Sequence, residues 1–254
     1  MYCYVFLICI LHQFLSCQPE PRIIDGQRAN IRDFPYYVAI DNCGATILSN
    51  RWLLTAAHCV DNPLVIGRRM IYAGSERKGI SKGHRYDEIK IHPDYIPFRQ
   101  GYIAYDLALL KLHTPLNFSD TIKPVRLPIA GTISRNPAHV FVGRGLDETG
   151  KPSKSLMKIR VNRLKPAECS KLFGTRSNEL PHLMDNSLIC TRRADRGPGV
   201  CMGDSGGPLV QNGIVMGVAS FLPIRSRDCT RTNIAFYTNV PTFVPWIKSI
   251  TGLK

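Results

Sequence analysis

The sequence predicts an all-β protein with a helix at its C-terminal end. Three observations support this prediction: short apolar runs recur along the chain, turn-forming residues separate them, and helical spacing of apolar residues is confined to two places. Short strands at regular intervals, with turn signals between them, are typical of sandwiches and barrels. The runs form two series on either side of residues 127–137, so we expect two β-barrels joined near that segment.

Each expected element follows from its own run of residues. The runs of the first series are Tyr36 to Ile40, Ala45 to Leu48, Met70 to Ala73, Glu88 to Ile91 and Leu107 to Leu112. The runs of the second are Val140 to Val142, Leu156 to Val161, Ser187 to Cys190, Pro208 to Val210, Ile214 to Phe221 and Ala235 to Val240. A short helix is expected over Pro166 to Phe173. A longer helix is expected after Pro241 and would cap the body with its apolar face, formed by Phe243, Val244, Ile247 and Ile250.

The first residues of the chain have the pattern of a secretory signal peptide. Their apolar core, Tyr4 to Leu11, is too short to span a bilayer, and no later segment is apolar enough to do so. We therefore expect a signal peptide over residues 1–17, a secreted, extracellular protein, and no association with a membrane.

The composition is strongly basic. The chain has 33 Lys and Arg residues against 19 Asp and Glu residues, a formal net charge of +14. Two interpretations stay open: the charge either keeps the surface soluble or attracts polyanions and acidic substrates. Nucleic acid is not an expected target outside the cell, and we expect a monomer. Asn117-Phe118-Ser119 is a sequon that permits glycosylation of Asn117.

The segment Gly203-Asp204-Ser205-Gly206-Gly207 places one serine between glycines and directly after an acid. Glycine adopts backbone conformations that other residues disfavour, so amide groups can converge beside the serine hydroxyl. The amides of Gly203 and Ser205 are therefore candidate donors of an oxyanion hole. Taken alone, the same residue types are also typical of an ordinary turn.

Two further motifs supply a base and a second acid. An apolar run ends at His58, and Asp106 precedes another apolar run. A serine hydroxyl needs a base to remove its proton, and the base needs a third group to orient it. His58, Asp106 and Ser205, in this order, resemble the chymotrypsin-like serine proteases. The resemblance implies two six-stranded antiparallel β-barrels with the active site between them, and an endopeptidase that hydrolyses protein or peptide substrates through an acyl-enzyme, without a cofactor.

Nine cysteines are present, of which Cys3, Cys9 and Cys17 lie in the leader. The other six suit three disulfides in a secreted protein, although the sequence alone allows fifteen pairings. No Cys-x-x-Cys pair occurs, which argues against a metal site. The resemblance implies three local pairs, the first of which would clamp the histidine loop: Cys43 with Cys59, Cys169 with Cys190, and Cys201 with Cys229.

The junction between Arg22 and Ile23 is similar to the activation site of this family. The resemblance implies cleavage after Arg22, which removes residues 18–22 as a propeptide and leaves a peptidase domain over residues 23–254. The new α-amino group of Ile23 would pair with Asp204, because a buried carboxylate without a partner is unfavourable. A trypsin-like protease is the expected activator, since the chain's own pocket has no acid to hold an arginine.

The resemblance also locates the substrate pocket. Its floor is Gly199, where trypsin-like members carry an aspartate. Leu222 stands where large-pocket relatives have glycine, and Ala235 narrows a second wall. We expect elastase-like cleavage after small or medium aliphatic residues, with chymotrypsin-like cleavage after aromatic residues as the second choice. The implied pocket residues are Gly199, Val200, Met202, Ser220, Phe221, Leu222 and Ala235.

Some features depart from the family pattern. Gly143-Arg144-Gly145 stands where relatives have Gly-Trp-Gly, and Leu222 lies at the rim of the expected cleft. These changes keep an alternative open, in which the chain is a catalytically weak or non-catalytic homologue that acts as a binding or decoy protein. The loop Glu76 to His84 is cationic where some relatives hold calcium through carboxylates. A hard divalent cation needs several oxygen ligands, so we expect no bound calcium or other metal.

Overall fold

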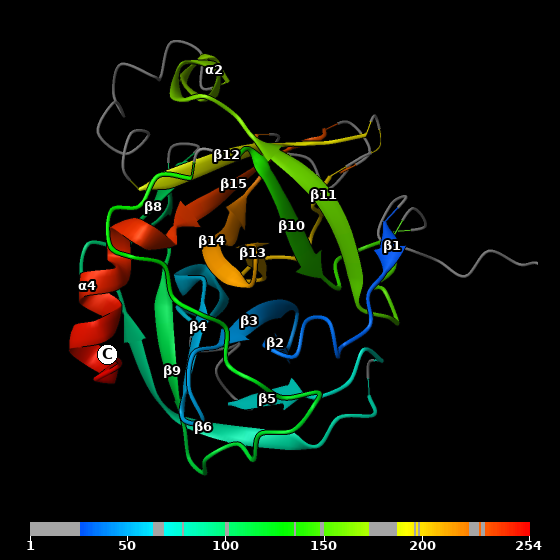
Figure 1. The fold of residues 1–254 in the computed structure, drawn as a ribbon, viewed down its shortest axis with the longest axis vertical. Helices are drawn as coiled ribbons and strands as arrows, with labels where there is room; N and C mark the ends of the chain where they lie inside the picture. Colours follow the sequence, from blue (N-terminus) through cyan, green and yellow to red (C-terminus); the bar gives the residue numbers. More distant parts are fainter. Residues whose placement is uncertain are drawn as a thin grey trace, which may run out of the picture.

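The computed structural model consists of two β-barrels, one from each half of the chain, with a helix along one side (Figure 1). The segments expected to be a signal peptide and a propeptide, including Arg22, lie outside the described residues, as does Ile23. The described residues are 26–62, 69–77, 79–99, 102–134, 136–147, 150–172, 187–195, 197, 199–223, 229 and 232–254.

The first barrel is closed, with strand order β2-β3-β4-β9-β6-β5 and antiparallel neighbours throughout. The sequence pattern did not predict β4, because its residues continue without a turn residue into Ala56 and Ala57, and this apolar run was interpreted only as the motif that ends at His58. The strands are β2 (Tyr37–Ile40), β3 (Cys43–Ile47), β4 (Trp52–Thr55), β5 (Met70–Ala73), β6 (Gly83–Ile91) and β9 (Ala108–Leu112).

The second barrel has the order β11-β10-β13-β14-β15-β12 and is closed by pairing of β11 with β12. A short N-terminal strand, β1 (Gln27–Arg28), adds to the outside of β11, where Arg28 faces Met157. Two six-stranded antiparallel barrels are thus confirmed. The strands are β10 (Ala138–Gly143), β11 (Met157–Arg163), β12 (Leu188–Arg193), β13 (Pro208–Gln211), β14 (Ile214–Phe221) and β15 (Ile234–Asn239).

The described residues contain few helices, as the sequence predicts. Helix α2 (Pro166–Lys171) begins with a proline that fits the first turn. Helix α4 (Val240–Thr251) begins one residue before Pro241, and it ends at Gly252, whose φ of 72° closes the helix in the left-handed conformation. Its buried residues include Phe243, Val244 and Ile247, so the predicted apolar face is confirmed. Within the described ranges, neither helix has the length and apolar character needed to cross a membrane.

One apolar core joins the two barrels. It contains Leu53 and Leu109 of the first barrel, Val142 and Val218 of the second, and Val244 of α4. A separate cluster fills the second barrel around Phe141 and Tyr237. Because the barrels share apolar packing, side chains at their junction are held by both halves of the chain. A short hairpin, β7 (Ile96–Arg99) with β8 (Tyr102–Ala104), leads into that junction.

Candidate active site

His58 lies directly after strand β4, on the short 3-10 helix η1 (Ala57–Cys59). Ala57 before it is fully buried, whereas the His58 side chain keeps 28% of its surface exposed. The disulfide between Cys43 and Cys59 ties η1 to β3, with 6.2 Å between the two Cα atoms. The histidine ring is thus anchored to the first barrel and still reachable from solvent.

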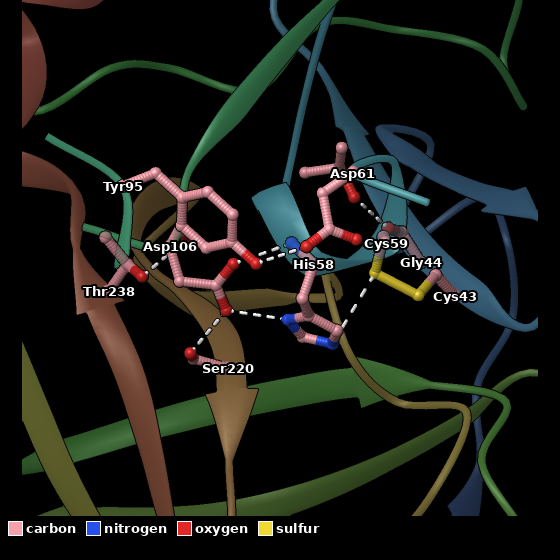
Figure 2. A network of polar contacts seen from close by, with 10 residues as sticks. Cys43, Gly44, His58, Cys59, Asp61, Tyr95, Asp106, Ser220 and Thr238 are labelled. Carbon is pink, nitrogen blue, oxygen red and sulfur yellow. Dashed lines mark hydrogen bonds and ion pairs between the residues drawn. A yellow bond between two sulfur atoms is a disulfide. The ribbon is translucent and has the colours of Figure 1, made fainter. Parts of the chain in front are cut away.

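Asp106 lies directly before β9 and is fully buried. Its Oδ1 accepts a hydrogen bond from the His58 backbone amide at 2.9 Å, and its Oδ2 lies 2.7 Å from His58 Nδ1 (Figure 2). The Ser220 hydroxyl donates to the same Oδ2, and the Thr238 hydroxyl donates to the Asp106 carbonyl at 2.8 Å. A carboxylate only accepts hydrogen bonds, so neutral His58 carries its proton on Nδ1 and keeps a lone pair on Nε2.

The electrostatics of this pair are set by burial and by opposite charge. Burial acts to lower the pKa of His58, but the charge and hydrogen bond of Asp106, with a smaller contribution from Asp61, raise that pKa above 6.5 overall. Burial acts to raise the pKa of Asp106, but His58 and the Ser220 hydroxyl hold it below 3.8. Asp61 is itself fixed, because the Tyr95 hydroxyl donates to its Oδ2 at 2.7 Å (Figure 2). Asp106 therefore stays charged near neutral pH.

Ser205 belongs to the second barrel but is tied to the first. The Gly44 amide donates to the Ser205 carbonyl at 2.7 Å, and Gly44 follows the disulfide-bonded Cys43 on β3. Gly206 has a φ of 76°, and a Cβ there would lie under 3.0 Å from Gly44 O and Thr55 Oγ1. The glycine after the serine is therefore required both by its backbone conformation and by close packing. This contact brings Ser205 to the side of the first barrel that carries His58.

The backbone beside Ser205 offers hydrogen-bond donors. Gly203 has a φ of 90°, a conformation that side chains disfavour. Within the described part of the chain, the amides of Gly203 and Ser205 donate to no other group, and the Ser205 hydroxyl is not hydrogen-bonded to His58. Two free amides beside a hydroxyl can accept a developing oxyanion, and hydrogen bonds of such sites often form fully only with substrate.

Asp204 points into the protein interior and is fully buried. Its carboxylate accepts hydrogen bonds from the Gly145 amide at 2.7 Å and from the Cys201 amide at 2.9 Å. Burial raises the pKa of Asp204 to about 7. A Cβ at Gly143 or Gly145 would overlap the carboxyl group, which explains why both positions are glycine. No basic side chain among the described residues forms an ion pair with Asp204.

Three disulfides hold the described chain, and they are the pairs that the resemblance implies: Cys43–Cys59, Cys169–Cys190 and Cys201–Cys229. The Cα atoms of the second and third pairs lie 5.8 and 5.4 Å apart. In the described ranges, the atoms of Cys43, His58 and Cys59 lie close enough to suggest a metal site. Both sulfurs are bonded to each other, however, so neither is a thiolate ligand.

Comparison with known proteins now identifies the family. The trypsin family model matches residues 23–247. The chain belongs to the trypsin family of serine proteases. Its fold is similar to that of mouse neuropsin, described as a serine protease expressed in the limbic system of the brain, with a TM-score of 0.75 and 22% identity over 90% of this chain and 99% of that one. It is also similar to human heparin-binding protein, with a TM-score of 0.71 and 24% identity over 91% and 98% of the two chains. These identities support a shared fold.

The trypsin-family position usually held by tryptophan carries Arg144, and this arginine is buried. Its guanidinium lies over the Tyr37 ring, 5.6 Å from the ring centroid, and donates to the Ser75 carbonyl. Burial lowers the pKa of Arg144, whereas Tyr37 and Glu76 act to raise it. Arg144 therefore stacks on Tyr37 at the position where relatives have tryptophan. It also connects Gly143 and Gly145, which pack against Asp204, to the loop at residues 75–76.

The expected pocket residues of this trypsin-family chain fall into different surroundings. Leu222 packs against the buried cluster of Val200 and Ala235, and also against the Cys201–Cys229 disulfide. Gly199 is buried near the Asn233 backbone, with its amide bonded to the Thr232 carbonyl at 3.1 Å. Of the other three implied residues, Met202 is 49% exposed, the Ser220 hydroxyl donates to Asp106, and Phe221 stacks on Phe236 with 4.6 Å between ring centroids.

Several residues around the catalytic motif were not identified from the sequence. Thr238 and the Tyr95–Asp61 pair all contact or influence the His58–Asp106 pair, and Ser220 was expected only as a pocket residue. Ser220 lies 114 residues from Asp106 along the chain, so no local pattern could connect them. Asn117 of the sequon lines a hollow of about 480 Å³ beside Lys82 and Arg85, and its glycosylation stays a prediction.

Proposed function

We propose that this trypsin-family chain is an active serine endopeptidase, with His58 as general base, Asp106 as its orienting acid and Ser205 as nucleophile. The observation that supports this most directly is the arrangement of Asp106, whose buried carboxylate fixes the His58 tautomer and leaves Nε2 as a proton acceptor. A protein that only binds a partner has no need of a charged, buried acid held in this way.

The chemistry follows from these positions. Ser205 Oγ attacks the scissile carbonyl carbon while His58 Nε2 takes its proton, and Asp106 stabilises the imidazolium that forms. The Gly203 and Ser205 amides would hold the oxyanion, and one such donor is typically worth about 100–1000-fold in kcat. His58 then gives its proton to the leaving amine, and a water molecule activated by His58 hydrolyses the acyl-enzyme.

Active-site titration tests this proposal. After cleavage at Arg22, an organophosphonate should label one serine per chain, and the label should map to Ser205. Ser205→Ala should lose labelling and nearly all peptidase activity, whereas Ser249→Ala, which changes an exposed serine of α4, should keep both. Absence of labelling in the cleaved parent chain would favour the alternative, a catalytically weak or non-catalytic homologue that acts as a binding or decoy protein.

We also propose that the chain is secreted as a zymogen and activated by cleavage after Arg22. The apolar leader and the three disulfides support secretion. The support for activation is Asp204, a buried acid that forms no ion pair with any described residue, so the α-amino group of Ile23 would supply its partner. Purified uncleaved chain should stay uncleaved alone and should mature when a trypsin-like protease is added. Maturation without any added protease would contradict the expected activator.

For primary specificity we propose cleavage after small or medium aliphatic residues. Leu222 packs toward Val200 and Ala235, which supports a shortened pocket, and Gly199 supplies no charge for a basic side chain. Leu222→Gly should raise kcat/KM for a Phe peptide relative to the matched Ala peptide by about tenfold, because hydrophobic pockets discriminate by about 1–3 kcal/mol per methylene.

The matched control for this specificity test is Ile129→Ala, since Ile129 is 82% exposed and is not one of the implied pocket residues. It should leave the Phe to Ala ratio within about twofold of the parent value. A dominant preference of the parent enzyme for Arg or Lys would overturn the pocket alignment. A dominant preference for Phe would show that Leu222 leaves the pocket open.

The partners that we propose are protein or peptide substrates, met by a monomeric enzyme. The net charge of +14 supports an additional attraction to acidic substrates or polyanions. The structural relative named human heparin-binding protein makes a sulfated polysaccharide a reasonable first probe for that attraction.

A further inference from the structure

A polar hollow of about 660 Å³ lies next to the N-terminal strand β1, apart from the catalytic residues. We call it the β1 hollow. It is lined by three segments that are distant in sequence: residues 28–30, residues 76–77 and residues 154–155. The lining residues are Arg28, Ala29, Asn30, Glu76, Arg77, Lys154 and Ser155.

Backbone contacts hold these three segments in place. The Ala29 amide donates to the Leu156 carbonyl at 2.8 Å, next to the pairing of β1 with β11 (Figure 1). The Leu156 amide in turn donates to the Glu76 carbonyl at 2.7 Å, and Arg77 forms an antiparallel bridge with Ser155. The walls are therefore fixed by main-chain hydrogen bonds before any ligand arrives, which reduces the entropy lost on binding.

The charge of the hollow is positive. Its described lining residues include three cations, Arg28, Arg77 and Lys154, and one acid, Glu76. Among the described residues, Arg77 and Lys154 make no ion pair, and both side chains are exposed. Glu76 lies close enough to the buried guanidinium of Arg144 to act against the lowering of the Arg144 pKa by burial, so part of the charge of Glu76 is already balanced. The two exposed cations are left to attract an anion.

The chemistry of the walls favours a sulfated sugar over an acidic peptide. Among the described residues that line the hollow, Ala29 is the one apolar residue, and it is 3% exposed, so these residues offer a peptide little surface for an apolar anchor. The guanidinium of Arg77 matches a sulfate through two parallel hydrogen bonds, and the Asn30 amide and Ser155 hydroxyl suit sugar hydroxyls. We propose that the β1 hollow is a binding site for a sulfated oligosaccharide, held mainly by Arg77 and Lys154.

The second hollow of the described chain is a weaker candidate. It measures about 480 Å³ and also carries cations, Lys82 and Arg85. Arg85, however, already pairs with Asp87, with 3.3 Å between Nε and Oδ1. Apolar residues, including Ala73 and Ile122, make up more of its lining. It therefore offers a matched control, because removing Lys82 and Arg85 takes away the same charge from a different hollow.

The test is calorimetric titration of the full chain with a heparin-derived hexasaccharide. Arg77→Ala with Lys154→Ala should weaken binding by on the order of tenfold or more, since charge-assisted hydrogen bonds are lost. Lys82→Ala with Arg85→Ala should change the Kd by less than about threefold, as expected for screened surface charge. The four side chains lie on the surface, so all variants should keep the parent circular dichroism spectrum.

Two results would overturn this site. Equal loss in the two double variants would mean that diffuse net charge, and not the β1 hollow, binds the sugar. Tighter binding of a hexaglutamate peptide than of the hexasaccharide would mean that the ligand is an acidic peptide. The readout is affinity and not turnover, so it is independent of whether Ser205 is catalytic.

Discussion

Replacing Asp204 by asparagine should stabilise the uncleaved chain at alkaline pH, which is the opposite of the usual effect of losing a buried polar group. The carboxylate is fully buried, accepts two backbone hydrogen bonds, and has no ion-pair partner in the described residues. Burial raises its pKa from 3.8 to about 7. The folded state therefore binds more protons than the unfolded state between those values, and stability falls as the pH rises through that window.

The magnitude follows from the shift. Each pKa unit is worth about 1.36 kcal/mol, so the ionised carboxylate lowers the free energy of unfolding at pH 8 by about 4 kcal/mol. Asp204→Asn removes this effect, but one of the two backbone N–H donors then faces the amide NH2, a loss of about 1 kcal/mol. The net gain at pH 8 is about 3 kcal/mol. At pH 5 the parent carboxyl is mostly protonated when folded, and the gain should shrink to under about 1 kcal/mol.

The assay is urea unfolding at pH 8 and pH 5, in an Arg22→Gln background that keeps the chain uncleaved. Asp120→Asn is the control, because its side chain is 71% exposed and the change should stay within about 0.5 kcal/mol at both pH values. The reasoning is refuted if Asp204→Asn is no more stable than the parent at pH 8, or if its advantage is the same at pH 5. In chain cleaved after Arg22, the same substitution should instead cost about 3–5 kcal/mol, because it would break a buried ion pair with Ile23.

Two further predictions concern the catalytic residues. Activity needs neutral His58, and neighbouring acids raise the pKa of His58, so kcat/KM should fall as the pH drops through a value above 6.5. Asp61→Asn should lower the pKa of His58 and move this fall in kcat/KM to lower pH. An unchanged pH profile would mean that Asp61 does not contribute to the pKa of His58. Gly206→Ala should lower both activity and the free energy of unfolding, the latter by about 1–3 kcal/mol, because the new Cβ overlaps Gly44. Gly213→Ala is the matched control for backbone strain in chemical unfolding, because Gly213 has a φ of 72° and its added Cβ would make only an ordinary contact, 3.6 Å from Arg126 Nη2.

Much of the fold was accessible from the sequence because its signals are local. Most strands appear as short apolar runs between turn residues, and the face of α4 appears at helical spacing. Strand β4 was missed because its apolar residues continue into the run that ends at His58, so no turn residue marks where the strand stops. Closure of the barrels also has no local signal, since pairing of β11 with β12 depends on the twist and register of every strand between them.

The catalytic motif was likewise visible in the sequence, as His58, Asp106 and the glycines around Ser205. Their residue types and order indicate nucleophilic catalysis by a serine, because few other combinations of side chains make a serine hydroxyl nucleophilic. The sequence could not reveal that Ser220 and Thr238 complete the environment of Asp106, since both come from the other barrel and meet it only after the barrels pack.

Charge shows the same division between composition and tertiary structure. The sequence by itself determined the family motif, the six cysteines after the leader and the net charge of +14. Only the tertiary structure decided which cations line the β1 hollow. The Ala29 amide donates to the Leu156 carbonyl and the Leu156 amide donates to the Glu76 carbonyl, and these bonds bring the three lining segments together. The physical reason is that composition fixes how much charge a chain carries, whereas long-range backbone pairing fixes where that charge is concentrated.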